Sequence, residues 1–161
     1  MRSVMLPKEY GTWAMLLVPL AVGLAVTEHF GLRGALFSLA TICLFFARYP
    51  LTLLARARLG RSRTKPPHTG AWLAVYSVLS VVFTIPLFYS YRLWWLIPLG
   101  ALSLALLLVS LYMLRQRLER SEVGELLGIA GLALAAPGAY YAVSGQMGTR
   151  AFVLWLMSYL Y

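Results

Sequence analysis

The sequence contains no aspartate and no asparagine, and its acidic residues are five glutamates among 161 residues. Without aspartate the chain has no Ser-His-Asp triad and no magnesium site built on paired aspartates. Charged residues of both signs make up 12% of the chain, whereas soluble domains carry about 25%. A single cysteine, Cys43, excludes a disulfide within the chain. These deficits argue against a soluble globular domain.

Hydrophobic residues make up 61% of the chain. A bilayer core about 30 Å thick needs about 20 apolar residues in a helix. Five stretches meet this length: residues 7–27, 32–54, 70–89, 93–114 and 123–143. A sixth, residues 151–161, is too short to cross. The sequence therefore predicts an all-α, polytopic transmembrane bundle of five full spans and an incomplete sixth.

In hydrocarbon, each backbone N–H and C=O group must find its hydrogen-bond partner within its own segment. Continuous apolar runs therefore favour helices over other structures. We interpret residues 1–161 as one transmembrane domain, the N-terminal part of a longer bundle. The net charge is +9, but a chain this apolar is not typical of nucleic-acid binding.

The positive residues alternate between the two sides of the predicted bundle. Eleven of the fourteen fall in three regions that share one side: Arg2, Lys8, Arg48, Arg56, Arg58, Arg61, Arg63, Lys65, Arg115, Arg117 and Arg120. The opposite loops hold Arg33, Arg92 and Arg150. The positive-inside rule then places the N-terminus and the basic loops in the cytoplasm. A secretory signal peptide is the competing interpretation of residues 7–27, and Pro7 and Glu9 argue against it.

Residues 7–19 read PKEYGTWAMLLVP. This segment resembles the N-terminal signature of the YwiC-like family of bacterial integral membrane proteins. The signature is a proline, then Glu-His-Gly, a small residue, Trp and a Leu-rich run ending in proline; its positions are matched by Pro7, Glu9, Gly11, Trp13 and Pro19. Tyr10 stands where the family has histidine, which argues against histidine-based proton chemistry there. The resemblance implies a multi-pass protein of the bacterial inner (cytoplasmic) membrane, family members longer by several spans, and no established activity.

A cluster of basic residues follows the second predicted span. The plainer interpretation is that it fixes topology and attracts anionic lipid, at about 1 kcal/mol per charge near the surface. The sharper interpretation is a docking site for a diphosphate or another anionic headgroup, which arginine binds through paired hydrogen bonds. The candidate residues for this site are Glu9, Arg48, Arg56, Arg61, Arg63, Lys65, His68, Arg115 and Arg117.

Residues 65–70, KPPHTG, faintly resemble the segment that leads into the third span in the UbiA superfamily of membrane prenyltransferases. The resemblance implies a helical bundle of related shape and, if the chain is an enzyme, a prenyltransferase-like one. In that superfamily an Asp-rich motif ends the second span, but residues 47–51 here read ARYPL. Because a magnesium–diphosphate site needs oxygen ligands, this arginine argues against the same catalytic apparatus. Whether the chain is an enzyme stays open.

Glu119, Glu122 and Glu125 recur every three residues, before and into the fifth predicted span. If helical, they lie near one face and form a candidate site for a divalent metal such as Mg²⁺, through carboxylate oxygens. The alternative is that they complement the helix dipole and pair with the arginines of the preceding loop.

Small and aromatic residues have plain structural interpretations. Gly124 with Gly128, and Gly131 with Ala135, are spaced for close packing of membrane helices. The tryptophans fall near the ends of predicted spans, where interfacial anchors lie.

The leading hypothesis is a YwiC-like membrane protein whose cytoplasmic charged mouth binds an amphiphilic anion, such as an isoprenoid diphosphate or the headgroup of a membrane lipid. The alternative is a small transporter or a non-catalytic subunit of a membrane complex. Apart from Arg48, no charged residue lies deep in a predicted span. Since ion-coupled transport normally uses such residues, the sequence gives the transporter little support.

Overall fold

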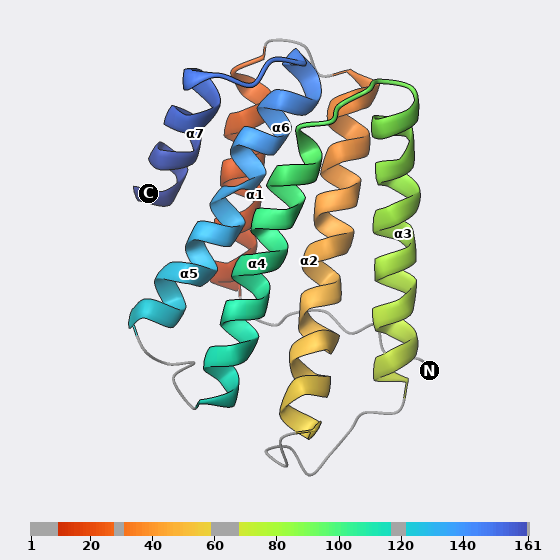
Figure 1. Cartoon of the computed structure of the whole chain (residues 1–161), viewed down its shortest axis with the longest axis vertical. Coiled ribbons are helices and arrows are strands. Elements are labelled where there is room, and N and C mark those ends of the chain that lie inside the picture. The colour runs from red at the N-terminus through yellow and green to blue at the C-terminus, as the bar shows by residue number, and fades with distance from the viewer. Residues whose placement is uncertain (1–9, 28–30, 59–67, 117–121, 161) are drawn as a thin grey trace.

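The computed structural model describes residues 10–27, 31–58, 68–116 and 122–160, with side chains for all of these except residues 10–12, 114, 122, 123 and 125. Within these ranges the chain forms helices and no strand, which confirms the all-α prediction. The helices are α1 (Tyr10–Ala25), α2 (Leu32–Arg58), α3 (Thr69–Tyr89), α4 (Leu96–Arg115), α5 (Glu122–Ala133), α6 (Ala135–Ser144) and α7 (Thr149–Leu160). They form an upright bundle (Figure 1).

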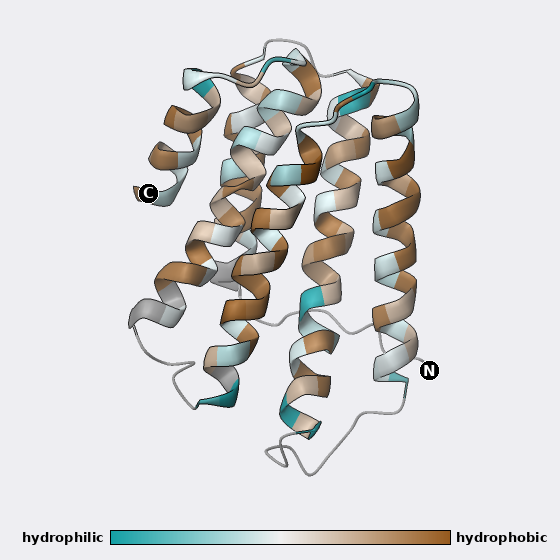
Figure 2. Ribbon diagram, in the orientation of Figure 1, coloured by the Kyte–Doolittle hydropathy of each residue, from teal (hydrophilic) through white to brown (hydrophobic). Residues whose placement is uncertain are grey.

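The helix ends gather at two opposite ends of the bundle. α2 and α4 end at the lower end in Figure 1, where α3 and α5 begin. We call this the basic end, because the described residues there include Arg56, Arg58, His68 and Arg115. Hydrophilic residues concentrate near the helix ends, and hydrophobic residues dominate between them (Figure 2). This distribution is typical of a bundle that spans an apolar layer.

In the described part of the chain, four helical segments are long and apolar enough to cross a membrane: Leu32–Arg58, Thr69–Tyr89, Leu96–Met113 and Leu126–Ser144. They correspond to the second, third, fourth and fifth predicted spans. α1 has 16 residues within the described ranges, so a fifth crossing stays a prediction. α7 has 12 residues, which is too short to cross, as the sequence indicates for residues 151–161.

The fifth predicted span is divided in two, because α5 ends at Ala133 and α6 begins at Ala135. Pro137 explains the division: it has no N–H to donate to the carbonyl of Ala133, and its ring crowds that carbonyl. The Gly138 N–H then donates to the Leu134 carbonyl at 3.2 Å, so helical hydrogen bonding resumes at once. The two helices run on in the same direction as one interrupted crossing (Figure 1).

The centre of the bundle is α6, whose residues from Ala135 to Ala142 are all buried. Ala136, Ala139 and Ala142 recur every three residues and have no exposed surface. Such small side chains let neighbouring helices approach closely, and α1, α2, α4 and α7 all contact α6.

A chain of aromatic contacts joins α1, α2 and α3. The ring of Trp13 lies edge-on to Phe45 and Phe46, with centroids 5.8 and 5.3 Å apart. Phe46 in turn lies 5.4 Å from Tyr76, which stacks on Trp72 at 5.5 Å. Offset and edge-on pairs stabilise packing beyond the area they bury. Trp13 therefore packs between helices, a role that its place at a span end did not predict.

Apolar side chains also cover the outer faces of α3 and α4. Val78 and Val81 on α3 are 60% and 57% exposed, and Leu108 on α4 is 57% exposed. Contiguous apolar surface of this kind marks contact with a membrane or a partner. Together with the four apolar helices, it is consistent with a multi-pass membrane protein.

Candidate functional site

A cavity of about 720 Å³ lies inside the bundle, between α2, α3 and α4, with α5 and α6 forming its inner wall. This volume is within the range of small-molecule binding sites. Most of the wall is apolar, and leucines contribute much of it.

Polar groups enter the cavity from three helices in a regular pattern. α2 supplies Thr41 and Arg48, which are seven residues apart, and α4 supplies Ser103 and Ser110 at the same spacing; α3 supplies Ser77, Ser80 and Thr84. Seven residues are close to two helical turns, so each set lies on one face of its helix. The three faces converge on the cavity.

Arg48 is the one charged side chain among the described residues that line the cavity. It lies ten residues before the end of α2 at Arg58, or about 15 Å along the helix axis. A Cβ atom placed on Gly128 of α5 would lie 3.5 Å from the Arg48 Nη2 atom. The guanidinium of Arg48 therefore extends from α2 to α5 and lies next to the backbone at Gly128, which has no side chain.

The described residues offer Arg48 no carboxylate. No ion pair of Arg48 is found among them, and the side chains of all five glutamates lie outside the described set. Arginine buried in a membrane bundle without an anion is costly. Among the described lining residues, the geometry therefore provides a single cationic point, Arg48.

Several cavity hydroxyls are already used in hydrogen bonds. Ser80 Oγ donates to the Ala40 carbonyl of the neighbouring helix at 3.1 Å. Thr41 and Thr84 donate to backbone carbonyls of their own helices, at 2.9 and 2.7 Å. In the described part of the chain, Ser77, Ser103 and Ser110 have no hydrogen-bond partner. These three hydroxyls are free to bond a ligand in the cavity.

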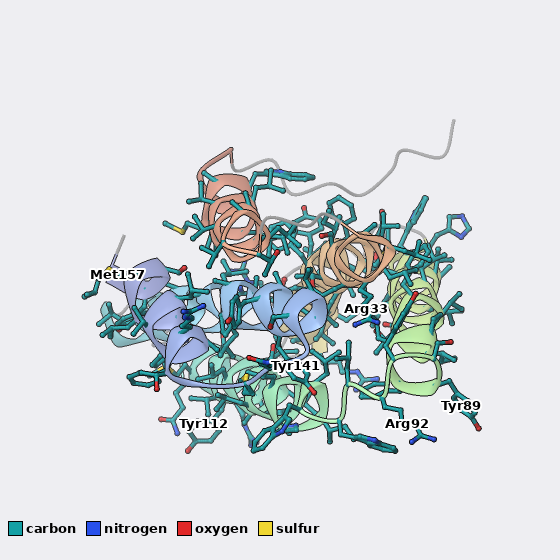
Figure 3. The ribbon with its side chains drawn as sticks, turned by 90° about the horizontal axis from the view of Figure 1, so that it is seen from above. Arg33, Tyr89, Arg92, Tyr112, Tyr141 and Met157 are labelled. Atoms are coloured by element: carbon teal, nitrogen blue, oxygen red, sulfur yellow. The ribbon has the colours of Figure 1, made fainter. Side chains whose placement is uncertain are left out.

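The end of the cavity away from the basic end is closed by packed side chains. Leu87, Leu93 and Leu96 are 1%, 3% and 8% exposed, and Tyr141 of α6 packs with them. The backbone N–H of Trp95 donates to the Tyr141 Oη atom at 3.4 Å, and this hydrogen bond links α6 to the turn before α4. Seen from above, Tyr141 lies between α6 and α4 (Figure 3). We call Leu87, Leu93, Leu96 and Tyr141 the plug.

The predicted anion-site residues divide into three groups. Arg48 lines the cavity, whereas Arg56, His68 and Arg115 are exposed at the basic end. Glu9, Arg61, Arg63, Lys65 and Arg117 lie outside the described residues, so their part in the site stays a prediction. The structure thus places one predicted residue, Arg48, in the cavity and three others at the basic end of the bundle.

The predicted metal site is placed only in part. α5 begins at Glu122, so Glu122 and Glu125 stand in its first turn, as the dipole interpretation requires. Their side chains, and the whole of Glu119, lie outside the described set. Among the residues that are described, no group of three or more metal-ligating side chains is found. Metal binding by these glutamates stays a prediction.

The sequence interpretation missed the hydroxyl residues of the cavity. Their signal was present, since Ser and Thr recur at intervals of three, four and seven residues on α3 and α4. Each hydroxyl alone is ordinary in a membrane helix, where it bonds to its own backbone. Only the arrangement of the three helices makes their faces converge.

The family model described as "YwiC-like protein" matches residues 6–140. The chain is similar to "Uncharacterized protein YwiC" from Bacillus subtilis (strain 168), with 29% identity over 99% of this chain. The match covers 63% of that relative, so the chain spans less than two thirds of its length. No solved structure matches, and the predicted UbiA-like arrangement gains no support.

Proposed function

The chain belongs to the YwiC-like family, and from that premise we propose that it is a membrane protein that binds an amphiphilic anion. The ligand class is an apolar chain carrying a phosphate or diphosphate, such as an isoprenoid diphosphate or a phosphorylated lipid headgroup. The anion lies toward the basic end, and the apolar chain lies within the bundle.

The observation that carries this proposal is the position of Arg48, the one charged side chain among the described residues that line an apolar cavity. Ionisable residues inside membrane bundles are expensive and usually functional. An anionic headgroup would offset the cost through charge-assisted, bidentate hydrogen bonds. Ser77 and Ser110 line the same cavity and would donate further hydrogen bonds.

The charges at the basic end support the same ligand class. Arg56, Arg58 and Arg115 stand at the ends of α2 and α4, on the side of the bundle toward which Arg48 lies. Surface arginines near a membrane attract anionic headgroups by about 1 kcal/mol each. They would collect the ligand, and Arg48 would hold it.

The proposal includes an orientation, with the N-terminus and the basic end in the cytoplasm of the inner membrane. Single cysteines test it in a Cys43→Ala background. Tyr89→Cys lies at the opposite end, where Tyr89 is 88% exposed, and we expect a membrane-impermeant maleimide to label it in intact cells. His68→Cys, at the basic end, should be labelled only after permeabilisation. Cys43→Ala alone is the control, and labelling with the reverse pattern would contradict the orientation.

Binding of farnesyl diphosphate to the purified protein tests the function, with farnesol as the uncharged comparison. Hydrogen bonds to charged groups contribute about 1.5–3 kcal/mol, so we expect the diphosphate to bind at least about tenfold more tightly than farnesol. Arg61→Ala combined with Arg63→Ala should weaken diphosphate binding by about tenfold. Arg33→Ala combined with Arg150→Ala removes the same charge at the opposite end and is the matched control. Equal binding of farnesol and farnesyl diphosphate would refute the proposal.

A magnesium arm of the same titration tests the predicted metal site. If Glu119, Glu122 and Glu125 hold Mg²⁺ against the diphosphate, added Mg²⁺ strengthens binding, and Glu122→Gln with Glu125→Gln removes that gain. A constant partner recovered by cross-linking, with no binding of either probe, would instead favour the subunit alternative.

A further inference from the structure

α3 and α4 follow each other in the chain but do not pack along each other. α3 packs on α2, whereas α4 packs on α5 and α6. Seen from above, α3 and α4 stand apart and are joined by the turn that carries Arg92 (Figure 3). The two helices therefore flank a gap, and α2 lies behind it (Figure 1).

The cavity is open at this gap. Ile97 and Leu104 of α4 line the cavity and are still 52% and 56% exposed, and Gly100 between them is exposed as well. Ser77 of α3 is the exposed lining residue across the gap. On the inner wall, Ala135 and Gly138 of α6 are buried. We call Ile97, Gly100, Leu104 and Ser77 the rim of the gap. These residues face outward from helices α3 and α4, which are apolar enough to cross a membrane.

The length of the cavity fits one hydrocarbon chain. On α2 the lining residues run from Phe37 to Leu51, and the part between Arg48 and Phe37 is about 16 Å long at 1.5 Å per residue. Half of a bilayer core is about 15 Å thick, so a chain that starts at Arg48 would extend through about one leaflet. The plug closes the far end at this point.

We infer that a single-chain anionic amphiphile enters the cavity sideways from the bilayer, between α3 and α4. Its phosphate binds Arg48. Its hydrocarbon chain extends from there to the plug, along the leucines of the cavity wall and past Thr41 and Thr84, whose hydroxyls are already bonded to backbone carbonyls. This inference rests on the proposed function. It adds the route by which the ligand enters the cavity and the number of its hydrocarbon chains, which is one. The plug blocks access from the opposite end, and a rim that is apolar apart from Ser77 offers nothing to a water-soluble anion.

Bulky substitutions on the rim test the route in nanodiscs of phosphatidylcholine. Nothing lies within 4 Å of a Cβ placed on Gly100, so Gly100→Trp meets no clash at its Cβ atom and places a bulky ring at the gap. Ala101→Trp is the matched control, because Ala101 is exposed on α4 but does not line the cavity. The probes are hexadecyl phosphate and farnesyl phosphate, which distinguish an acyl-type from an isoprenoid chain, with hexadecanol as the uncharged comparison.

We expect Gly100→Trp to weaken binding of at least one phosphate probe by about tenfold and Ala101→Trp to leave it unchanged. Leu104→Trp is a second rim variant, used if Gly100→Trp is unstable. A photoreactive group at the chain terminus of the probe should label peptides of α3, α4 or the plug.

The outcomes separate the route from the function. If Arg48→Gln weakens binding but both rim variants bind like the wild type, sideways access is wrong and the proposed function stands. If the rim variants weaken binding and Arg48→Gln does not, the cavity binds the hydrocarbon chain as inferred, and the proposal that Arg48 recognises the anion is wrong. Cross-linking of the rim to a second copy of this chain would make the gap a protein interface and overturn the inference.

Discussion

Arg48→Leu is expected to stabilise the protein and to abolish its anion binding. On insertion scales an arginine at the centre of a membrane helix costs about 2.5–3.5 kcal/mol, whereas leucine is slightly favourable. Arg48 faces a cavity, which reduces that cost. We therefore expect a gain of about 1–3 kcal/mol in stability, seen as a higher thermal midpoint in detergent.

Binding should change in the opposite sense. The guanidinium is the one charged group that the described cavity offers a phosphate, and charge-assisted hydrogen bonds contribute about 1.5–3 kcal/mol. Loss of Arg48 should then weaken farnesyl diphosphate binding by about ten- to a hundredfold. Arg48→Lys keeps the charge without the planar fork, so its affinity should fall between those of the wild type and the leucine variant.

Arg33→Leu is the matched control on the same helix. Arg33 is exposed at the opposite end of α2, and its guanidinium carbon lies 4.4 Å from the centre of the Tyr91 ring. This variant should neither raise the thermal midpoint nor weaken binding by more than about twofold, since it leaves the cavity unchanged. A lower midpoint for Arg48→Leu would show that the guanidinium is a structural partner of a carboxylate, and would count against a binding role.

Gly23→Leu should prevent α1 from packing on α6. A Cβ atom at Gly23 would overlap the backbone carbonyl of Ala136, a residue with no exposed surface. Both groups belong to helix backbones, so no side-chain rotation relieves the overlap and the helices must separate. Overpacking costs about 1–3 kcal/mol and sometimes more, and this contact should lie at the upper end. We expect a thermal midpoint at least several degrees lower, or loss of the monodisperse protein.

Gly100→Leu controls for the effect of leucine in a membrane helix. Gly100 also lies within a helix, but the space around its Cβ position is open. Because glycine costs a helix about 1 kcal/mol relative to better helix formers, this variant should be as stable as the wild type or slightly more so. If Gly23→Leu retained the wild-type midpoint, the contact between α1 and α6 would be wrong.

The close contacts were the hardest feature to predict. The sequence singled out Gly124 with Gly128, and Gly131 with Ala135, for close helix packing, yet Gly128 and Gly131 line the cavity. Among the described glycines, the tight approaches are at Gly23 against Ala136, at Gly138 against the Phe37 ring and at Gly34 against Leu24. Spacing marks glycines that permit close packing, but it does not show which of them meets a partner.

The sequence by itself determined the helices and their approximate ends, and it placed Arg56, Arg58 and Arg115 at the end of the bundle opposite Arg33, Arg92 and Arg150. Apolar runs fix helices because a backbone in hydrocarbon must satisfy its own hydrogen bonds. The structure was needed to show that Pro137 divides α5 from α6, since Pro19, Pro50 and Pro86 lie inside unbroken helices. The tertiary structure alone decided which faces meet. In a soluble helix the apolar stripe identifies the buried face. Lipid is as apolar as leucine, so the apolar residues of α3 and α4 do not show which side of each helix faces the bundle. The convergence of Arg48 with the hydroxyls of α3 and α4 follows from that packing.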